Sequence, residues 1–108
     1  MNVLFVCSRN RKRSPTAGNV FAGYVGIETA SAGTARDADV PASEDLIAWA
    51  EIIFVMEPVH RKRLQSMFPA QLRNKKLVVL GIPDDYELMA PDLITVLKQK
   101  VERHLRIQ

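Results

Sequence analysis

Short apolar blocks recur along the chain and are separated by polar or amphipathic segments. Residues 2–6 and 51–56 form nearly continuous apolar runs, which are typical of strands buried on both faces of a sheet. Shorter strands are predicted near residues 27–31 and over residues 76–80. The pattern therefore predicts four strands.

Helices are predicted between and after these strands. Ser14-Pro15 starts the first helix, because serine can cap free amide groups and proline is tolerated at the first helical position. The predicted helices cover about residues 14–24, 43–49, 58–68 and 91–105. Alternating strands and helices predict an α/β fold of three layers, with a four-stranded parallel sheet between helices on both faces.

Two chemically capable residues follow strands of this predicted sheet. Cys7 follows the first strand, and Asp84 follows the fourth. In open parallel sheets, ligands bind beyond the carboxyl ends of the strands. We therefore expect Cys7 and Asp84 at the same edge of the sheet, although they are far apart in sequence.

The composition is that of one small globular domain. The chain has 108 residues, of which 47% are hydrophobic and 25% charged, so a single domain over residues 1–108 is expected. No apolar run approaches the roughly 20 residues of a membrane helix, and no signal peptide is recognisable, so we expect a cytoplasmic protein without membrane contact. The one cysteine cannot form an internal disulfide or, by itself, a cysteine-based zinc site, which fits a reducing compartment.

Basic residues are concentrated just after the first strand. The formal net charge is only +3, but Arg9, Arg11, Lys12 and Arg13 lie within five consecutive positions. An anionic ligand is expected there. A second basic group at residues 60–63 has helical spacing and is interpreted as a solvated helix face.

The loop Cys7–Ser14 combines a nucleophile with an anion site. Successive loop amides can turn inward around an anion, and the following helix adds the positive end of its dipole. The same field stabilises a thiolate at Cys7 and makes the sulfur a nucleophile. A phosphate or sulfate ion is the expected occupant, and the expected binding residues are Ser8, Arg9, Asn10, Arg11, Lys12 and Ser14.

Further residues supply the remaining parts of a phosphatase. The planar guanidinium of Arg13 can hold two phosphoryl oxygens at once, and Ser14 can cap the helix and donate a hydrogen bond to the sulfur. Ester cleavage also needs a general acid, for which Asp84 is the candidate and Asp85 the alternative. An aspartate pair after a proline is also typical of a turn. The combination predicts a phosphomonoester hydrolase that forms a phosphocysteine intermediate.

Four apolar residues are candidates for the walls of a cleft around an aromatic leaving group. They are Tyr24, Trp49, Tyr86 and Met89. Residues of this type more often belong to the core, and both interpretations are open at this point.

The loop resembles the signature of the low-molecular-weight protein tyrosine phosphatase family, Val-Cys-x-Gly-Asn-x-Cys-Arg-Ser-Pro. Val6-Cys7, Asn10 and Arg13-Ser14-Pro15 match it in register. Three later segments also resemble parts of that family, namely the segment after its second strand, its third strand and its Asp-Pro-Tyr acid loop: Ser31–Thr34, Ile52–Glu57 and Asp84–Tyr86. The similarity covers nearly the whole chain, in order.

This resemblance implies the fold and the chemistry together. It implies the four-stranded parallel fold of these phosphatases, with Cys7 as nucleophile, Arg13 as phosphate clamp and Asp84 as general acid. The implied substrates are phosphorylated proteins or small phosphomonoesters, with phosphotyrosine typical of the family and phosphoarginine known for some bacterial members. No metal or cofactor is implied.

Three positions depart from the family pattern. Arg9 stands where the family has glycine, so the loop must either find another backbone conformation or hold a side chain in a costly one. Lys12 replaces the second cysteine of the signature, and Asp85 replaces the proline after the acid.

Other functions fit parts of the same pattern. A thiol-dependent arsenate reductase shares the loop, but it would need an external thiol because this chain has no second cysteine. A phosphocarrier domain needs neither Arg13 nor Asp84. A non-catalytic module that grips the phosphates of RNA or of a phosphoprotein is the alternative from another class, although an aromatic content of 6% leaves few platforms for stacking bases.

Overall fold

The computed structural model describes residues 1–105 and contains one sheet of four parallel strands. The strands are β1 (Asn2–Cys7), β2 (Glu28–Gly33), β3 (Ile52–Val55) and β4 (Lys76–Val79), and their spatial order is β2-β1-β3-β4. β1 lies in the interior of the sheet and pairs with β2 on one side and β3 on the other. The predicted four-stranded parallel sheet is confirmed.

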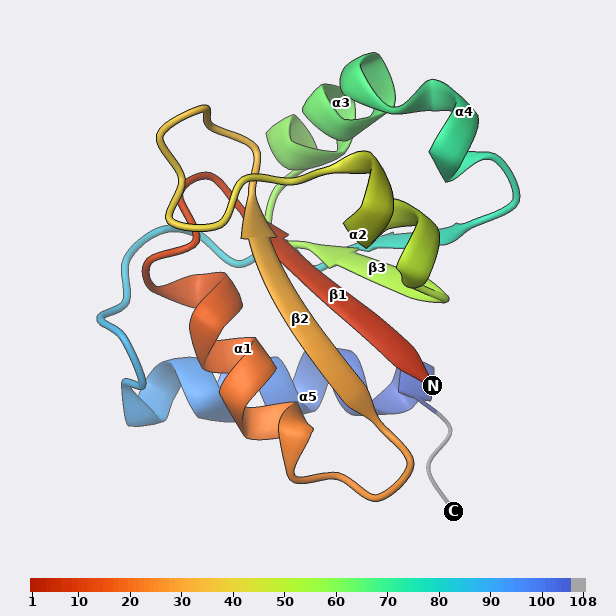
Figure 1. Cartoon of the computed structure of the whole chain (residues 1–108). Helices are drawn as coiled ribbons and strands as arrows, with labels where there is room; N and C mark the ends of the chain where they lie inside the picture. Colours follow the sequence, from red (N-terminus) through yellow and green to blue (C-terminus); the bar gives the residue numbers. More distant parts are fainter. Residues whose placement is uncertain (106–108) are drawn as a thin grey trace.

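Helices cover both faces of the sheet, as the α/β pattern predicts (Figure 1). One face carries α1 (Arg13–Ala22) and α5 (Pro91–Leu105). The other carries α2 (Glu44–Trp49), α3 (Pro58–Met67) and α4 (Pro69–Leu72). The result is a three-layer arrangement of helices, sheet and helices.

The side chains of β1 alternate between the two halves of the core. Val3, Phe5 and Cys7 belong to the cluster under α1 and α5, whereas Leu4 and Val6 belong to the cluster under α2 and α3. All five are 4% exposed or less, which explains why this strand is an uninterrupted apolar run. Cys7 is the last residue of the strand, so its side chain lies at the carboxyl edge, on the face that α1 covers.

The predicted helix boundaries hold within a few residues, with one exception. The segment predicted as one helix to residue 68 continues after Phe68 into the short α4, which the sequence pattern did not predict; Pro69 separates the two helices because proline disfavours a helical conformation at the residue before it. α1 begins at Arg13 rather than at Ser14, with Lys12 as its N-terminal flanking residue. Ser43, in contrast, caps α2 as its position predicts, by accepting a hydrogen bond from the backbone amide of Leu46 at 3.2 Å.

No helix within residues 1–105 has the length and apolar character needed to cross a membrane. The single domain expected over residues 1–108 extends to residues 106–108, which lie outside the described part of the chain.

Candidate active site

The loop between β1 and α1 turns through one residue in the left-handed conformation. That residue is Asn10, with φ of 58°, whereas Arg9 is not among the residues with positive φ. Asparagine tolerates this region better than most side chains. The arginine in the family's glycine position is therefore accommodated by ordinary backbone geometry at Arg9 and a left-handed turn at Asn10.

The segment that follows β2, residues 34–39, forms hydrogen bonds with this loop. The backbone amides of Thr34, Ala35 and Asp39 donate hydrogen bonds to the carbonyl groups of Cys7, Ser8 and Arg9 at 3.0, 2.8 and 3.1 Å. The residues that follow β2 therefore hold the backbone of the loop in place.

Gly33, the last residue of β2, allows this close approach. A Cβ atom at this position would collide with the carbonyl oxygen of Ser8 and come within 2.7 Å of the Cβ of Ala38. In the sequence, Gly33 stood out only as part of the segment that resembles the phosphatase family. Its structural importance comes from the backbone that packs against it.

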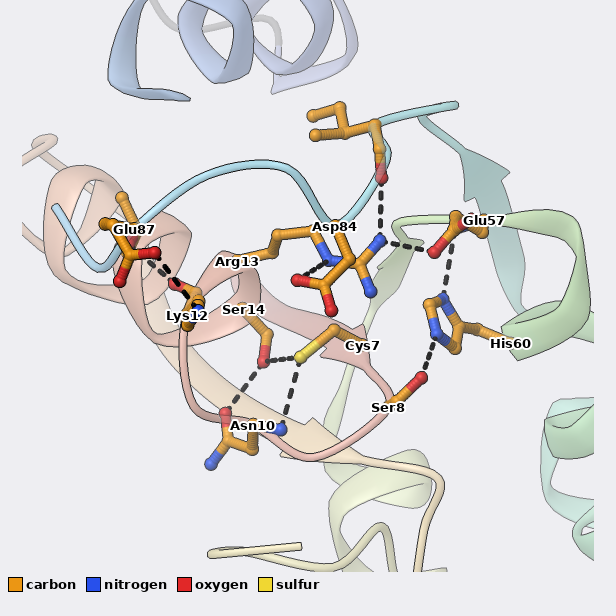
Figure 2. A network of polar contacts seen from close by, with 12 residues as sticks. Cys7, Ser8, Asn10, Lys12, Arg13, Ser14, Glu57, His60, Asp84 and Glu87 are labelled. Carbon is orange, nitrogen blue, oxygen red and sulfur yellow. Dashed lines mark hydrogen bonds and ion pairs between the residues drawn. The ribbon is translucent and has the colours of Figure 1, made fainter. Parts of the chain in front are cut away.

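Two hydrogen bonds reach the sulfur of Cys7. The backbone amide of Asn10 donates to Sγ across 3.2 Å, and the hydroxyl of Ser14 lies 2.9 Å from it (Figure 2). Hydrogen bonds to the charged form of an acid favour that form. A loop amide and a hydroxyl thus both contact the sulfur.

Ser14 contacts the sulfur but does not cap α1, contrary to the prediction. No side chain caps this helix, and Ser14 lies within its first turn. Its hydroxyl also lies 2.8 Å from Oδ1 of Asn10 and 3.3 Å from the carbonyl of Ala32, and both of these groups are acceptors. The Ser14 hydroxyl has one hydrogen to donate. It can donate to Asn10 or Ala32 when Cys7 is a thiol, and to the sulfur when Cys7 is a thiolate.

Arg13 is buried and anchored through one end of its guanidinium. Its Nη1 donates to Oε1 of Glu57 at 2.5 Å and to the carbonyl oxygen of Ile82 at 2.7 Å, and its side chain is only 3% exposed. The remaining donors include the parallel pair on Nε and Nη2. That pair is the edge with which arginine holds two oxygens of a phosphoryl group.

Asp84 lies beside this edge. Its Oδ1 is 3.7 Å from Nε of Arg13, and its side chain is 66% exposed. Asp85 is also exposed but is not part of the cavity that Asp84 lines. Of the two candidate acids, the structure brings Asp84 to the loop.

The segment that carries Asp84 is fastened to the start of α1. The buried hydroxyl of Thr16 accepts a hydrogen bond from the amide of Met89 at 2.9 Å and donates to the carbonyl of Lys12 at 2.6 Å. The ammonium of Lys12 lies 3.3 Å from the carboxylate of Glu87. The contacts of Met89 and Glu87 join residues more than 70 positions apart in sequence.

Glu57 and His60 are site residues that the sequence pattern did not reveal. Both lie at the start of α3, where they form a capping box: the Glu57 side chain accepts from the backbone of His60, and the His60 ring accepts from the backbone of Glu57. The interpretation of His60 as part of a solvated basic face is wrong, because its side chain is fully buried. The sequence signal that could have revealed Glu57 was its position: it is an acidic residue just after a buried strand, at the edge of the sheet where Cys7 and Asp84 also lie.

His60 joins this capping box to the loop. Its Nδ1 accepts from the amide of Glu57 at 3.0 Å, and its Nε2 lies 2.9 Å from Oγ of Ser8. Burial, followed by the charge of Arg13, lowers the pKa of His60 from 6.5 to about 4 despite the opposing effect of Glu57. The ring is therefore neutral near pH 7.

A cavity of about 630 Å³ opens above the loop. Seven of the predicted site residues line it, and the structure adds Ala35 and Arg63; the predicted seven are Cys7, Ser8, Arg9, Arg11, Lys12, Arg13 and Asp84. The two remaining predicted residues, Asn10 and Ser14, do not line the cavity but contact the sulfur from behind.

The proposed aromatic walls are not part of this cavity. Tyr24 packs on Phe21 with ring centroids 4.9 Å apart, and its hydroxyl donates to Glu102, which raises the pKa of Tyr24 to about 12. Trp49 packs against the core cluster on the opposite face of the sheet. Tyr86 packs against the same core cluster as Tyr24, so the core interpretation is correct for these three residues, whereas Met89 is exposed. None of the four candidates lines the cavity.

Solved structures share this fold. The chain matches a low-molecular-weight protein tyrosine phosphatase from Streptococcus pyogenes with a TM-score of 0.76 and 18% identity, covering 96% of this chain and 93% of that one. It matches the tyrosine phosphatase Wzb from Escherichia coli K30, solved with phosphate, with a TM-score of 0.74 and 20% identity over 94% of each chain. It also matches the YwlE arginine phosphatase from Geobacillus stearothermophilus with a TM-score of 0.71 and 20% identity, covering 94% of this chain and 91% of that one.

These likenesses confirm the expected fold, that of the low-molecular-weight protein tyrosine phosphatases. No protein-family model matches the sequence, and no curated protein matches it.

Proposed function

We propose that this protein is a cysteine-dependent phosphatase that hydrolyses phosphomonoesters through a phosphocysteine at Cys7. The observation that carries the proposal is the arrangement around one cavity: a hydrogen-bonded sulfur, the Nε and Nη2 edge of a buried Arg13, and Asp84 3.7 Å from that Nε. Nucleophile and clamp come from the two ends of the loop between β1 and α1, and the acid comes from the segment after β4.

In the first step, the thiolate of Cys7 attacks phosphorus and the bond to the ester oxygen breaks. Asp84 gives its proton to the departing oxygen, which leaves as an alcohol or phenol. Arg13 holds two of the phosphoryl oxygens through Nε and Nη2, where it stabilises the charge that they carry in the transition state. Glu57 and the carbonyl of Ile82 keep the guanidinium in place meanwhile.

In the second step, the Asp84 carboxylate takes a proton from water, and the water oxygen attacks phosphorus. The sulfur–phosphorus bond breaks, inorganic phosphate forms and the thiolate returns. Ser14 lies 2.9 Å from the sulfur and donates a hydrogen bond to the leaving thiolate. Atoms and charge balance without a metal, an oxidant or a reductant.

The proposed substrates are phosphorylated proteins or small phosphomonoesters, and protein phosphotyrosine is the first to test. Two of the fold's neighbours are described as tyrosine phosphatases and one as an arginine phosphatase, which supports testing both kinds of phosphorylated residue. A cytoplasmic location is part of the proposal, since a thiolate nucleophile must stay reduced.

The test is release of p-nitrophenol from p-nitrophenyl phosphate between pH 5 and 7 in the presence of a chelator. Wild type is compared with Cys7→Ser and Arg13→Ala. We expect turnover by wild type and its loss in both variants, with a phosphocysteine trapped by rapid acid quench in wild type alone.

Absence of turnover by fresh, reduced wild type on aryl phosphates and on phosphoarginine would contradict the proposal. A phosphate-binding module would then be favoured if Cys7→Ser leaves phosphate affinity intact.

A further inference from the structure

The cavity around Cys7 is strongly cationic. Five of its nine lining residues are basic, one is acidic and none is aromatic; the basic ones are Arg9, Arg11, Lys12, Arg13 and Arg63. Arg13 is the clamp for the transferred phosphoryl group. The other four cations also line the cavity, whereas none of the four apolar residues considered as cleft walls does.

Carboxylates compensate most of these cations. Arg9 lies 3.9 Å from Asp37, Arg11 lies 3.3 Å from Asp39, and Lys12 pairs with Glu87. Arg13 pairs with both Glu57 and Asp84. These ion pairs reduce the charge that the four residues offer to a ligand.

Arg63 differs from the other lining cations. Within residues 1–105 it forms no ion pair with a carboxylate, and its Nη1 contacts only the hydroxyl of Thr34, at 3.4 Å. Its charge nevertheless reaches the site, since it is one of the charges that lower the pKa of His60. The guanidinium is therefore positioned at the cavity with its charge uncompensated.

The fold holds Arg63 next to the nucleophile's loop. α3 is fixed by the capping box at its start and by the burial of His60 and Leu64. His60 lies three positions before Arg63 and is its neighbour on the helix surface. Thr34, its contact, donates its backbone amide to the carbonyl of Cys7 at 3.0 Å. Arg63 thus approaches the cavity from α3, independently of the loop that binds the phosphoryl group.

We propose that Arg63 forms a second anion subsite, so that the preferred substrates are phosphomonoesters with a further anionic group close to the phosphate. A carboxylate or a second phosphate would supply that group. This inference rests on the proposed phosphatase function and adds the class of leaving group. The subsite binds the part of the substrate that departs, so it acts on substrate affinity more than on the chemical step.

Three matched aryl phosphates test the subsite: 3-carbamoylphenyl phosphate, 3-carboxyphenyl phosphate and benzene-1,3-diyl bis(phosphate). Phosphate release gives kcat and KM for wild type, Arg63→Gln and Arg61→Gln. Arg61 is exposed on the same helix but does not line the cavity, so its variant removes the same charge elsewhere.

We expect wild type to favour the anionic substrates over the carboxamide by about three- to fivefold in kcat/KM, mainly through KM, as for one partly exposed ion pair. Arg63→Gln should remove that preference and Arg61→Gln should keep it. The preference should also shrink as salt is raised. Comparing the carboxylate with the bisphosphate shows which anionic group the subsite takes.

A preference that persists in Arg63→Gln, or that is absent from wild type, overturns the subsite. Failure of the phosphatase function gives a different result, namely no release of phosphate from any of the three compounds. The subsite is then measured by titrating the same compounds into Cys7→Ser with and without Arg63→Gln. Equal affinities of both proteins for the anionic compounds would reject it.

Discussion

The imidazole of His60 donates a hydrogen bond to the hydroxyl oxygen of Ser8 across 2.9 Å (Figure 2). The direction follows from the other ring nitrogen, which accepts from the amide of Glu57 and so cannot carry a proton. In the neutral ring, the proton must be on Nε2. The hydroxyl hydrogen of Ser8 is consequently free for another acceptor, and Ser8 lines the cavity.

Ser8→Ala is expected to lower kcat/KM for p-nitrophenyl phosphate by about ten- to a hundredfold, since a hydrogen bond to a charged group contributes about 1.5–3 kcal/mol. Ser8→Thr retains the hydroxyl and should recover most of the loss. Steady-state kinetics at pH 6 measures both variants. Equal kinetics of wild type and Ser8→Ala would show that the hydroxyl does not reach the substrate.

The buried His60 should make stability depend on pH. Its pKa is about 4 in the folded protein, against an ordinary value of 6.5, so between these values the unfolded chain binds a proton that the folded chain does not. Its contribution to stability is complete above pH 6.5 and is lost as pH falls towards 4. The expected loss is on the order of 3 kcal/mol.

Urea unfolding of wild type and His60→Gln at pH 7 and pH 4.5 measures this loss. The stability advantage of wild type over the variant should shrink by about 2–3 kcal/mol at the lower pH. His104→Gln serves as a comparison, because the pKa of His104 is also lowered but that ring lies outside the site. If the stability advantage of wild type is the same at both pH values, His60 binds a proton in the folded protein as readily as in the unfolded chain, and its pKa is not lowered.

Asp84→Asn should lower turnover by a factor that depends on how good the leaving group of the substrate is. On phenyl phosphate we expect a loss of about a hundredfold or more, because the poor leaving group needs the proton. On p-nitrophenyl phosphate the loss should be much smaller. Asp85→Asn is the matched control and should affect neither substrate strongly; the opposite pattern would assign the acid to Asp85.

Gly33→Ala should disturb the loop through packing. The added Cβ would meet the Ser8 carbonyl, and we expect a loss of about 1–3 kcal/mol in the free energy of unfolding, together with reduced activity. Gly18→Ala is the control: its Cβ would have ordinary contacts, the nearest at 3.8 Å, and alanine is favoured within a helix. Thermal unfolding and p-nitrophenyl phosphate kinetics compare the two, and equal behaviour would exclude the close approach at Gly33.

The alternation of strands and helices follows from the amino-acid sequence alone, because strands buried on both faces and capped or proline-started helices leave local patterns. The same patterns place Cys7 and Asp84 after strands, and parallel pairing brings the carboxyl ends of strands to one edge. Local sequence patterns and the rules of parallel pairing are therefore sufficient to bring those two residues together.

The side chains that complete the site depend instead on tertiary packing. The sequence pattern does not distinguish the basic residues 60–63 from one another. In the fold, packing buries His60 against Ser8 and leaves Arg63 at the cavity. Packing also brings Glu57 to Arg13. It places Trp49 against the core cluster on the face of the sheet that α1 does not cover. Contacts between residues distant in sequence depend on how layers pack, and no local pattern of polar and apolar positions encodes that packing.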